Sequence, residues 1–158
     1  MRQPWSSSLC HVSTSSSIIR SEVLHSPIEI TADERRLILD QISEKVIGCI
    51  HQVSNVLGAG FLEKVYENAL VVELRQLGFQ VAQQHKIEVR YKDVVVGDFA
   101  ADILIENCII IEVKAVKVLD DIHAAQCLNY LRATGLQVCL LVNFGIPRAA
   151  IRRIVHNF

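Results

Sequence analysis

The chain has 158 residues, 51% of them hydrophobic and 21% charged, and its formal net charge is −1 at pH 7. This length and apolar content suit one domain with a core of ordinary size. A near-neutral chain has no overall attraction to polyanions, so contact with nucleic acid would need a local basic surface. No apolar run approaches the ~20 residues of a membrane-spanning helix.

Residues 1–30 differ in composition from the rest of the chain. Nine serines and two prolines fall among them, and such a segment buries too little apolar surface to offset the entropy of ordering it. We therefore expect a disordered Ser-rich tail over residues 1–30 and one domain over residues 31–158. A transit peptide is the weaker alternative, because no amphipathic helix emerges from so many serines.

The cysteines predict no disulfide framework. Their number is odd and none of them forms a CxxC pair, which suits small buried residues of a cytoplasmic protein. They are Cys10, Cys49, Cys108, Cys127 and Cys139.

Two helices are expected first. A capping-box pattern at residues 31–34 opens a helix, and the glycines of residues 58–60 end it. A second helix is predicted over residues 61–77, closed by Gly78. We expect its buried stripe to consist of Leu62, Val65, Ala69, Val72 and Leu77.

Strands and a third helix follow. Ile87, Val89 and Tyr91 recur with a period of two, and a turn is expected at residues 92–93. The next strand begins near residue 94, with a bulge or kink at Gly97. A third helix is predicted to begin at residues 120–121 and to run to residue 134. Its expected inner face is Ile122, Ala125, Leu128 and Leu131.

The end of the chain completes the predicted layers. Residues 136–144 are apolar enough for a strand that is buried on both faces, whereas residues 146–158 fit a strand or a helix equally well. A sheet with helices on both of its faces is the simplest arrangement that buries all of these elements.

The most unusual stretch is residues 98–114, where two apolar strands carry charged side chains. Asp102, Glu112 and Lys114 lie among Ile, Leu and Val, and a buried charge costs several kcal/mol unless it is paired or holds a metal. Glu112 and Lys114 share one face of their strand. Asp102 joins Glu112 only if the turn between the strands has an odd length, so we expect a three-residue turn at residues 106–108 or a bulge.

This set of residues suits a hard cation. Two carboxylates on neighbouring strands can hold Mg²⁺ or Mn²⁺, and a lysine beside them can orient an attacking water or neutralise charge on a phosphate. A buried ion-pair network with a structural role alone explains the same spacing equally well. The sequence has no GxxxxGK loop, no zinc-ligand spacing and no identifiable Ser-His-Asp set.

The chain resembles the GxxExxY family within the PD-(D/E)xK nuclease superfamily over roughly residues 35–155. Four motifs carry the resemblance. They are Gly60-Phe-Leu-Glu63-Lys-Val-Tyr66, then Asp102 with Glu112-Val-Lys114-Ala115, then His123-Ala-Ala-Gln126-Cys-Leu-Asn-Tyr130, and finally Leu140-Leu-Val-Asn-Phe144-Gly. Two positions depart from the pattern: Ser54 stands where members often have histidine, and Ala101 stands where the superfamily name has proline.

The resemblance implies an α/β restriction-endonuclease-like core, a central mixed β-sheet flanked by helices, that hydrolyses phosphodiester bonds in DNA or in RNA. It implies that Asp102, Glu112 and Glu63 bind Mg²⁺ or Mn²⁺ and that Lys114 assists the attack. Gln126 and Tyr130, one helical turn apart, would support the site together with Tyr66. The alternative is a nucleic-acid- or protein-binding module that retains the fold and has little catalysis. A homodimer is a further expectation, because so small a domain contacts little duplex alone.

Overall fold

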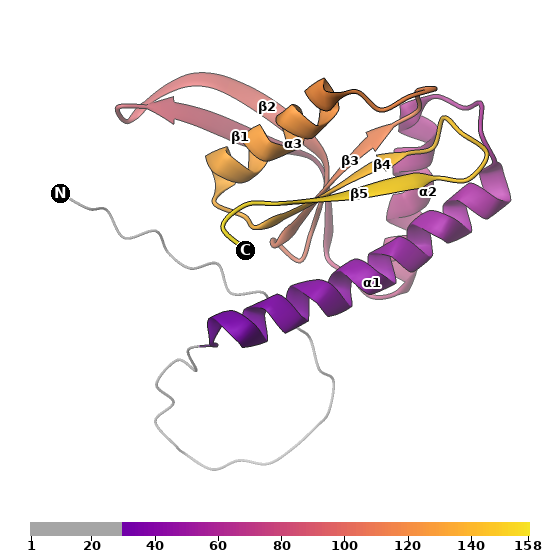
Figure 1. Cartoon of the computed structure of the whole chain (residues 1–158), viewed down its shortest axis with the longest axis horizontal. Helices are drawn as coiled ribbons and strands as arrows, with labels where there is room; N and C mark the ends of the chain where they lie inside the picture. The colour runs from indigo at the N-terminus through magenta and orange to yellow at the C-terminus, as the bar shows by residue number, and fades with distance from the viewer. Residues whose placement is uncertain (1–29) are drawn as a thin grey trace, which may run out of the picture.

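The computed structural model describes residues 30–158, so the expected N-terminal tail lies outside the described residues except for Ile30. Within these described residues, three helices and five strands follow one another (Figure 1). In order they are α1 (Ala32–Leu57), α2 (Glu63–Gln76), β1 (Val81–Tyr91), β2 (Val94–Ile105), β3 (Ile109–Lys114), α3 (Asp121–Thr134), β4 (Val138–Asn143) and β5 (Ala150–Val155).

The strands form one mixed sheet in the order β1-β2-β3-β4-β5. Only β3 and β4 are parallel, and α3 connects them; the other neighbouring pairs are antiparallel. Helices α1 and α2 pack on one face of the sheet and α3 packs on the other (Figure 1). The predicted layering is therefore confirmed. Within residues 30–158, no helix is both long and apolar enough to span a membrane.

Helix α1 begins and ends where the capping signals predict. The Thr31 hydroxyl accepts the backbone N–H of Glu34 at 3.2 Å, and the Glu34 carboxylate accepts the backbone N–H of Thr31 at 2.7 Å. Gly58 and Gly60 have φ values of 65° and 120° after the helix, a conformation that glycine adopts without a steric cost. Near its end, Ser54 accepts the backbone N–H of Ala149 at 3.0 Å, so this departure from the family pattern ties α1 to the segment before β5.

Helix α2 buries a different face from the predicted one. Leu62 and Val72 are exposed, and the buried side chains are Tyr66, Glu67, Leu70, Val71 and Leu74. The predicted stripe was wrong because apolarity alone does not predict that a tyrosine and a glutamate are buried. Both form hydrogen bonds with residues outside α2.

Helix α3 has the predicted bounds, and its inner face agrees with the prediction only in part. Ile122 is exposed, whereas Cys127 and Tyr130 are buried together with Leu131. Leu131 was predicted correctly, whereas the cysteine and the tyrosine beside it were not indicated by apolarity. Four of the five cysteines agree with the prediction, because Cys49, Cys108, Cys127 and Cys139 are buried, and Cys10 lies outside the described residues.

Strands β1 and β2 form a long hairpin whose far end extends beyond the rest of the sheet (Figure 1). Lys92 and Asp93 make its two-residue turn with φ values of 48° and 65°, as type I′ turns require. The register shifts between Val89 and Arg90, which leaves Val96 as an extra residue on β2 beside Gly97. The predicted bulge is thus present. Only the second half of β2 is buried.

Candidate active site

The β2–β3 connection has the predicted odd length. Residues 106–108 form a three-residue turn, and Ile103 pairs with Ile111. Continuing this register places Asp102 opposite Glu112. The open question about the last residues is also settled, because Ala150–Val155 is strand β5, antiparallel to β4.

Strand β2 changes the face that it presents at Asp102. Ile103 packs in the core under α1 and α2, whereas Ala101 packs in the core under α3. Residues two apart on a regular strand face the same way, so the strand must twist between them. On β1, Gln84 lies opposite Asp102, since Gln83 pairs with Ile103 and His85 with Ala101. Gln84 has a φ of 50°, and the backbone irregularity therefore lies at the candidate site.

The Asp102 carboxylate replaces part of the strand ladder. Its Oδ2 accepts the backbone N–H of Val113 on β3 at 2.8 Å, beyond the last regular pair. Its Oδ1 accepts the side-chain amide of Gln84 at 3.2 Å. Burial raises the pKa of Asp102, and these two hydrogen bonds oppose that shift. The Asp102 side chain thereby keeps β2 attached to β3 beyond the last regular backbone pair of the two strands.

Glu112 and Lys114 form a partly enclosed ion pair. The Lys114 Nζ donates to Glu112 Oε1 at 2.7 Å, and the two side chains are 14% and 4% exposed. Burial opposes the charge on Lys114, yet Glu112, Glu63 and Asp102 together outweigh it and raise the pKa of the lysine. The lysine is therefore held as a cation next to three carboxylates.

The second oxygen of Glu112 is the unusual feature of the site. Burial and the charge of Asp102 raise the pKa of Glu112 to about 7, although Lys114 opposes the shift. Among the described residues, Glu112 Oε2 is buried without a hydrogen-bond partner. The only other such oxygen there, Asp40 Oδ1, lies 2.6 Å from Arg153 in an ion pair. A cation or a hydrogen-bond donor next to Glu112 Oε2 would therefore offset the cost of burying this oxygen.

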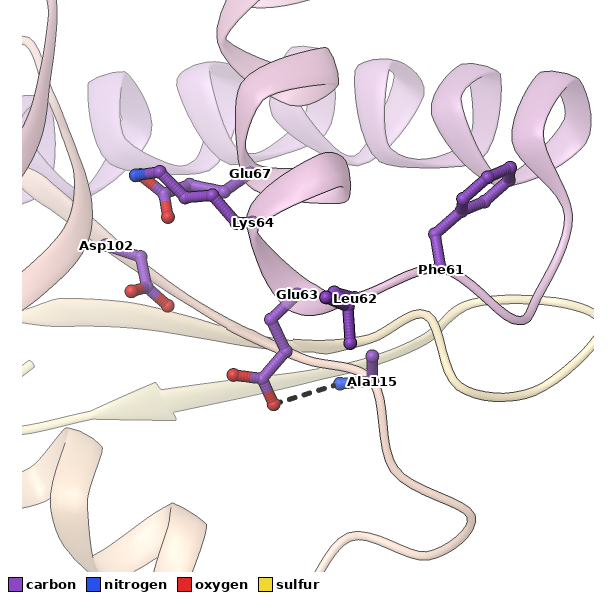
Figure 2. Close-up of a pocket in the computed structure, with 7 residues that line it drawn as sticks. All are labelled: Phe61, Leu62, Glu63, Lys64, Glu67, Asp102 and Ala115. Carbon is purple, nitrogen blue, oxygen red and sulfur yellow. Dashed lines mark hydrogen bonds and ion pairs between the residues drawn. The ribbon is translucent and has the colours of Figure 1, made fainter.

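Glu63 reaches the same region from the first turn of α2. Its carboxylate accepts the backbone N–H of Ala115 at 3.2 Å, directly after β3. Glu63 and Asp102 both line an open cavity of about 460 Å³. Figure 2 shows both side chains among the residues that line it. The other residues that line this cavity are Phe61, Leu62, Lys64, Glu67 and Ala115.

The end of β4 holds the loop that follows Lys114. The buried Asn143 accepts the backbone N–H of Val116 at 3.0 Å and donates to the Val116 carbonyl at 2.8 Å. A Cβ on Gly145 would lie 2.3 Å from that carbonyl oxygen, so this approach requires glycine. Phe144 donates its backbone N–H to the Lys114 carbonyl at 2.8 Å. These contacts give the Asn-Phe-Gly motif a structural role beside the ion pair.

Tyr66 holds the loop that precedes Glu63. Its ring stacks on Phe144 with 4.6 Å between centroids. Its hydroxyl donates to the Gly58 carbonyl at 2.8 Å and accepts the backbone N–H of Phe61 at 3.1 Å. The tyrosine therefore packs against the sheet and holds the loop from which α2, and hence Glu63, begins.

We expect Tyr66→Phe to lower the free energy of unfolding by about 1–2 kcal/mol, because two partly buried hydrogen bonds are lost while the ring stacking stays. Urea unfolding followed by circular dichroism would measure this change. Tyr91→Phe is the matched control, since Tyr91 is exposed; an equal effect in both variants would contradict the loop-holding role.

Gln126 and Tyr130 lie together on α3, as their spacing predicts. Gln126 Nε2 donates to the Tyr130 hydroxyl at 2.6 Å. Burial and the nearby charge of Glu112 raise the pKa of Tyr130, which places this pair close to the ion pair of β3. His123 instead accepts the backbone N–H of Asp120 at 3.0 Å and caps the helix.

The sequence interpretation missed three residues near Asp102, which are Glu67 on α2 and Gln83 and Gln84 on β1. Glu67 is 3% exposed and binds the side chains of Lys64, Gln83 and Gln84 at distances of 2.7–3.1 Å. Neighbouring strand residues normally point to opposite faces. A strand pattern therefore could not predict that Gln83 and Gln84 of β1 both contact Glu67 of α2. Across residues 30–158, no three His, Cys, Asp or Glu side chains already form a ready set of metal ligands.

Comparison with known proteins identifies the fold family. A family model described as the PD-(D/E)XK nuclease superfamily matches residues 40–154. Among solved structures, SSO0001 is similar with 20% identity and a TM-score of 0.48, over 78% of this chain and 63% of that chain. The alkaline exonuclease LHK-Exo from Laribacter hongkongensis is similar with 14% identity and a TM-score of 0.46, over 82% of this chain and 73% of that chain.

This chain therefore spans less than two thirds of the length of SSO0001. No curated protein matches the sequence. The mixed five-stranded sheet between helices is a restriction-endonuclease-like α/β core. Because the family model covers most of the chain, the protein belongs to the PD-(D/E)XK nuclease superfamily.

Proposed function

We propose that this protein is a Mg²⁺- or Mn²⁺-dependent nuclease that hydrolyses phosphodiester bonds in DNA, with RNA as the second possible substrate. One observation carries the proposal: a buried glutamate oxygen without a partner lies beside a second carboxylate and a lysine in a nuclease fold. The motif around Glu63 and Tyr66 supports assignment to the GxxExxY family within the superfamily.

The residues fit a divalent cation. PD-(D/E)XK nucleases generally use such ions, and carboxylate oxygens are the ligands that Mg²⁺ and Mn²⁺ prefer. Asp102 and Glu112 would hold the ion, and Glu63 would contribute directly or through water. A cation would also offset the burial that raises the pKa of Glu112. When bound, it would supply positive charge for a phosphate and acidify a water molecule.

The other side chains orient and protect the reacting groups. Lys114 is held as a cation within reach of the Glu112 carboxylate, where it can neutralise charge that develops on a phosphate or position the attacking water. Gln126 and Tyr130 would support this region from α3. The Asn143 contacts keep the backbone after Lys114 in place.

Cleavage assays test the proposal directly. Single-stranded, linear duplex and supercoiled DNA, together with RNA, would be incubated with Mg²⁺, with Mn²⁺ or with EDTA. We expect cleavage only with a metal and a loss of about 100-fold in Asp102→Asn. Asp98→Asn is the matched control, because Asp98 lies on the same strand with its side chain 67% exposed. Absence of cleavage of every substrate, together with no metal binding by calorimetry, would overturn the proposal.

One observation favours a binding module with little catalysis as the second candidate. The two lysines of the site are already paired, Lys64 with Glu67 and Lys114 with Glu112, so less positive charge is free to stabilise a phosphate during cleavage. Nucleic-acid binding by the wild type that is equal with metal and with EDTA, without cleavage, would favour this candidate.

A further inference from the structure

Gln84 joins two carboxylates with a single amide group. Its Nε2 donates to Asp102 Oδ1 at 3.2 Å and to Glu67 Oε2 at 3.1 Å. A primary amide nitrogen carries two hydrogens, one for each carboxylate. Because both neighbours only accept hydrogen bonds when ionised, the nitrogen and not the oxygen of the amide must face them. The orientation of Gln84 is therefore determined by its partners.

Glu67 in turn is firmly held. It is 3% exposed and binds Lys64 Nζ at 2.7 Å and Gln83 Nε2 at 3.0 Å through Oε1. Its Oε2 remains for Gln84. Figure 2 shows Glu67 and Lys64 on the helix above Asp102, on one side of the same cavity. A fixed anion on α2 thus anchors the amide that reaches Asp102.

The backbone of β1 makes this bridge possible. Gln84 has a left-handed φ of 50°, which costs a residue other than glycine about 1 kcal/mol. Without this turn, Gln83 and Gln84 would point to opposite faces of the sheet, and only one of them could reach Glu67. Backbone strain of this kind persists where surrounding contacts stabilise it. Here those contacts are the hydrogen bonds of Gln84 to Glu67 and Asp102.

We propose that Gln84, anchored by Glu67, is a positioning residue that sets the orientation of the Asp102 carboxylate for metal binding. This inference rests on the proposed function, because it assumes that Asp102 is a metal ligand. Val113 fixes one oxygen of Asp102 and Gln84 fixes the other, so the carboxylate cannot rotate freely. Partners of this kind commonly change metal affinity by 10–100-fold when they are removed.

Gln84→Gly is the sharpest test. Glycine adopts the left-handed conformation without strain, so the variant removes the two hydrogen bonds and keeps the backbone. Gln83→Ala is the matched control, since the side chain of Gln83 donates hydrogen bonds to Glu67 and Asn68 and none to Asp102. Isothermal titration of each protein with Mn²⁺ alone would measure affinity. Melting in EDTA would report whether each variant is folded.

We expect Gln84→Gly to bind Mn²⁺ about tenfold more weakly than wild type, with a similar melting temperature in EDTA. Gln83→Ala should bind as wild type does. In cleavage assays the concentration of Mn²⁺ for half-maximal rate should rise by the same factor, and kcat should recover at saturating metal. A purely structural role would change the melting temperature without this recovery.

The outcomes separate the inference from the proposed function. Equal Mn²⁺ affinity of wild type and Gln84→Gly would overturn the positioning role and leave the nuclease proposal intact. Weaker binding by Gln84→Gly without cleavage by the wild type would support the positioning role and contradict the nuclease proposal. A wild-type protein that binds no Mn²⁺ would overturn both.

Discussion

Glu112→Gln should reduce metal-dependent cleavage by about 1000-fold, equivalent to about 4 kcal/mol in the activation free energy, and should make the folded protein more stable at pH 8. The activity falls because a neutral amide is a poor ligand for a hard cation. The stability rises because the amide keeps the shape of the side chain while the buried charge is gone. Loss of activity with a gain in stability is the result expected of a functional residue.

The direction of the stability change follows from the pKa of Glu112. The folded protein has a pKa of about 7 for this group, against an ordinary value of 4.5. Between these values the folded state binds the proton more tightly, so stability is greatest below pH 4.5 and falls as the pH rises to 7. The total loss is about 3 kcal/mol.

Urea unfolding at pH 5 and pH 8 would measure this loss. We expect wild type to be less stable at pH 8 and Glu112→Gln to lack most of the difference. Glu106→Gln is a suitable control, because Glu106 lies in the turn and is partly exposed. A variant of Glu112 that is destabilised at pH 8 would show instead that the charged residue stabilises the fold.

Lys114→Met should also reduce cleavage by about 1000-fold, but it should lower stability at pH 8 by about 2–3 kcal/mol. Methionine keeps most of the apolar stem of lysine while removing the ammonium group. Glu112 would then be buried with neither oxygen paired to a cation among the described residues. Breaking one partner of a buried pair is costly for this reason. At pH 5, where Glu112 is protonated, the stability difference should nearly vanish.

The double variant Glu112→Gln with Lys114→Met gives the decisive comparison. We expect it to recover most of the stability lost in Lys114→Met at pH 8, because no unpaired buried carboxylate remains. It should recover none of the activity. Recovery of activity along with stability would mean that the single variants were inactive only because they unfold.

Several local features followed from the sequence alone. The capping box at Thr31 and the glycines after residue 57 placed the ends of α1, since these signals act within one helical turn. The alternation around residues 98–114 required an odd turn length, and the three-residue turn provides it. In both cases the relevant interactions join residues that are close together in the chain, so local rules suffice.

The buried face of α2 did not follow from the sequence. Leu and Val occur on more than one face of α2, and the sequence does not show which face is buried. Leu62 and Val72 are exposed. Tyr66 is buried because its hydroxyl meets the loop before α2, and Glu67 is buried because strand β1 supplies two amides. A polar residue can be inside only where partners from other elements meet it, and a single helix does not reveal those partners.

The sequence by itself therefore determined the order of the elements up to β4, most of their ends and the turn length that aligns Asp102 with Glu112. The tertiary structure alone decided how the site is built around that alignment. Strand β2 changes faces at Asp102, opposite the left-handed backbone of Gln84, and Glu63 arrives from α2 at the end of β3. These contacts join residues 18 to 52 positions apart, where packing between elements outweighs the local preferences that a sequence pattern records.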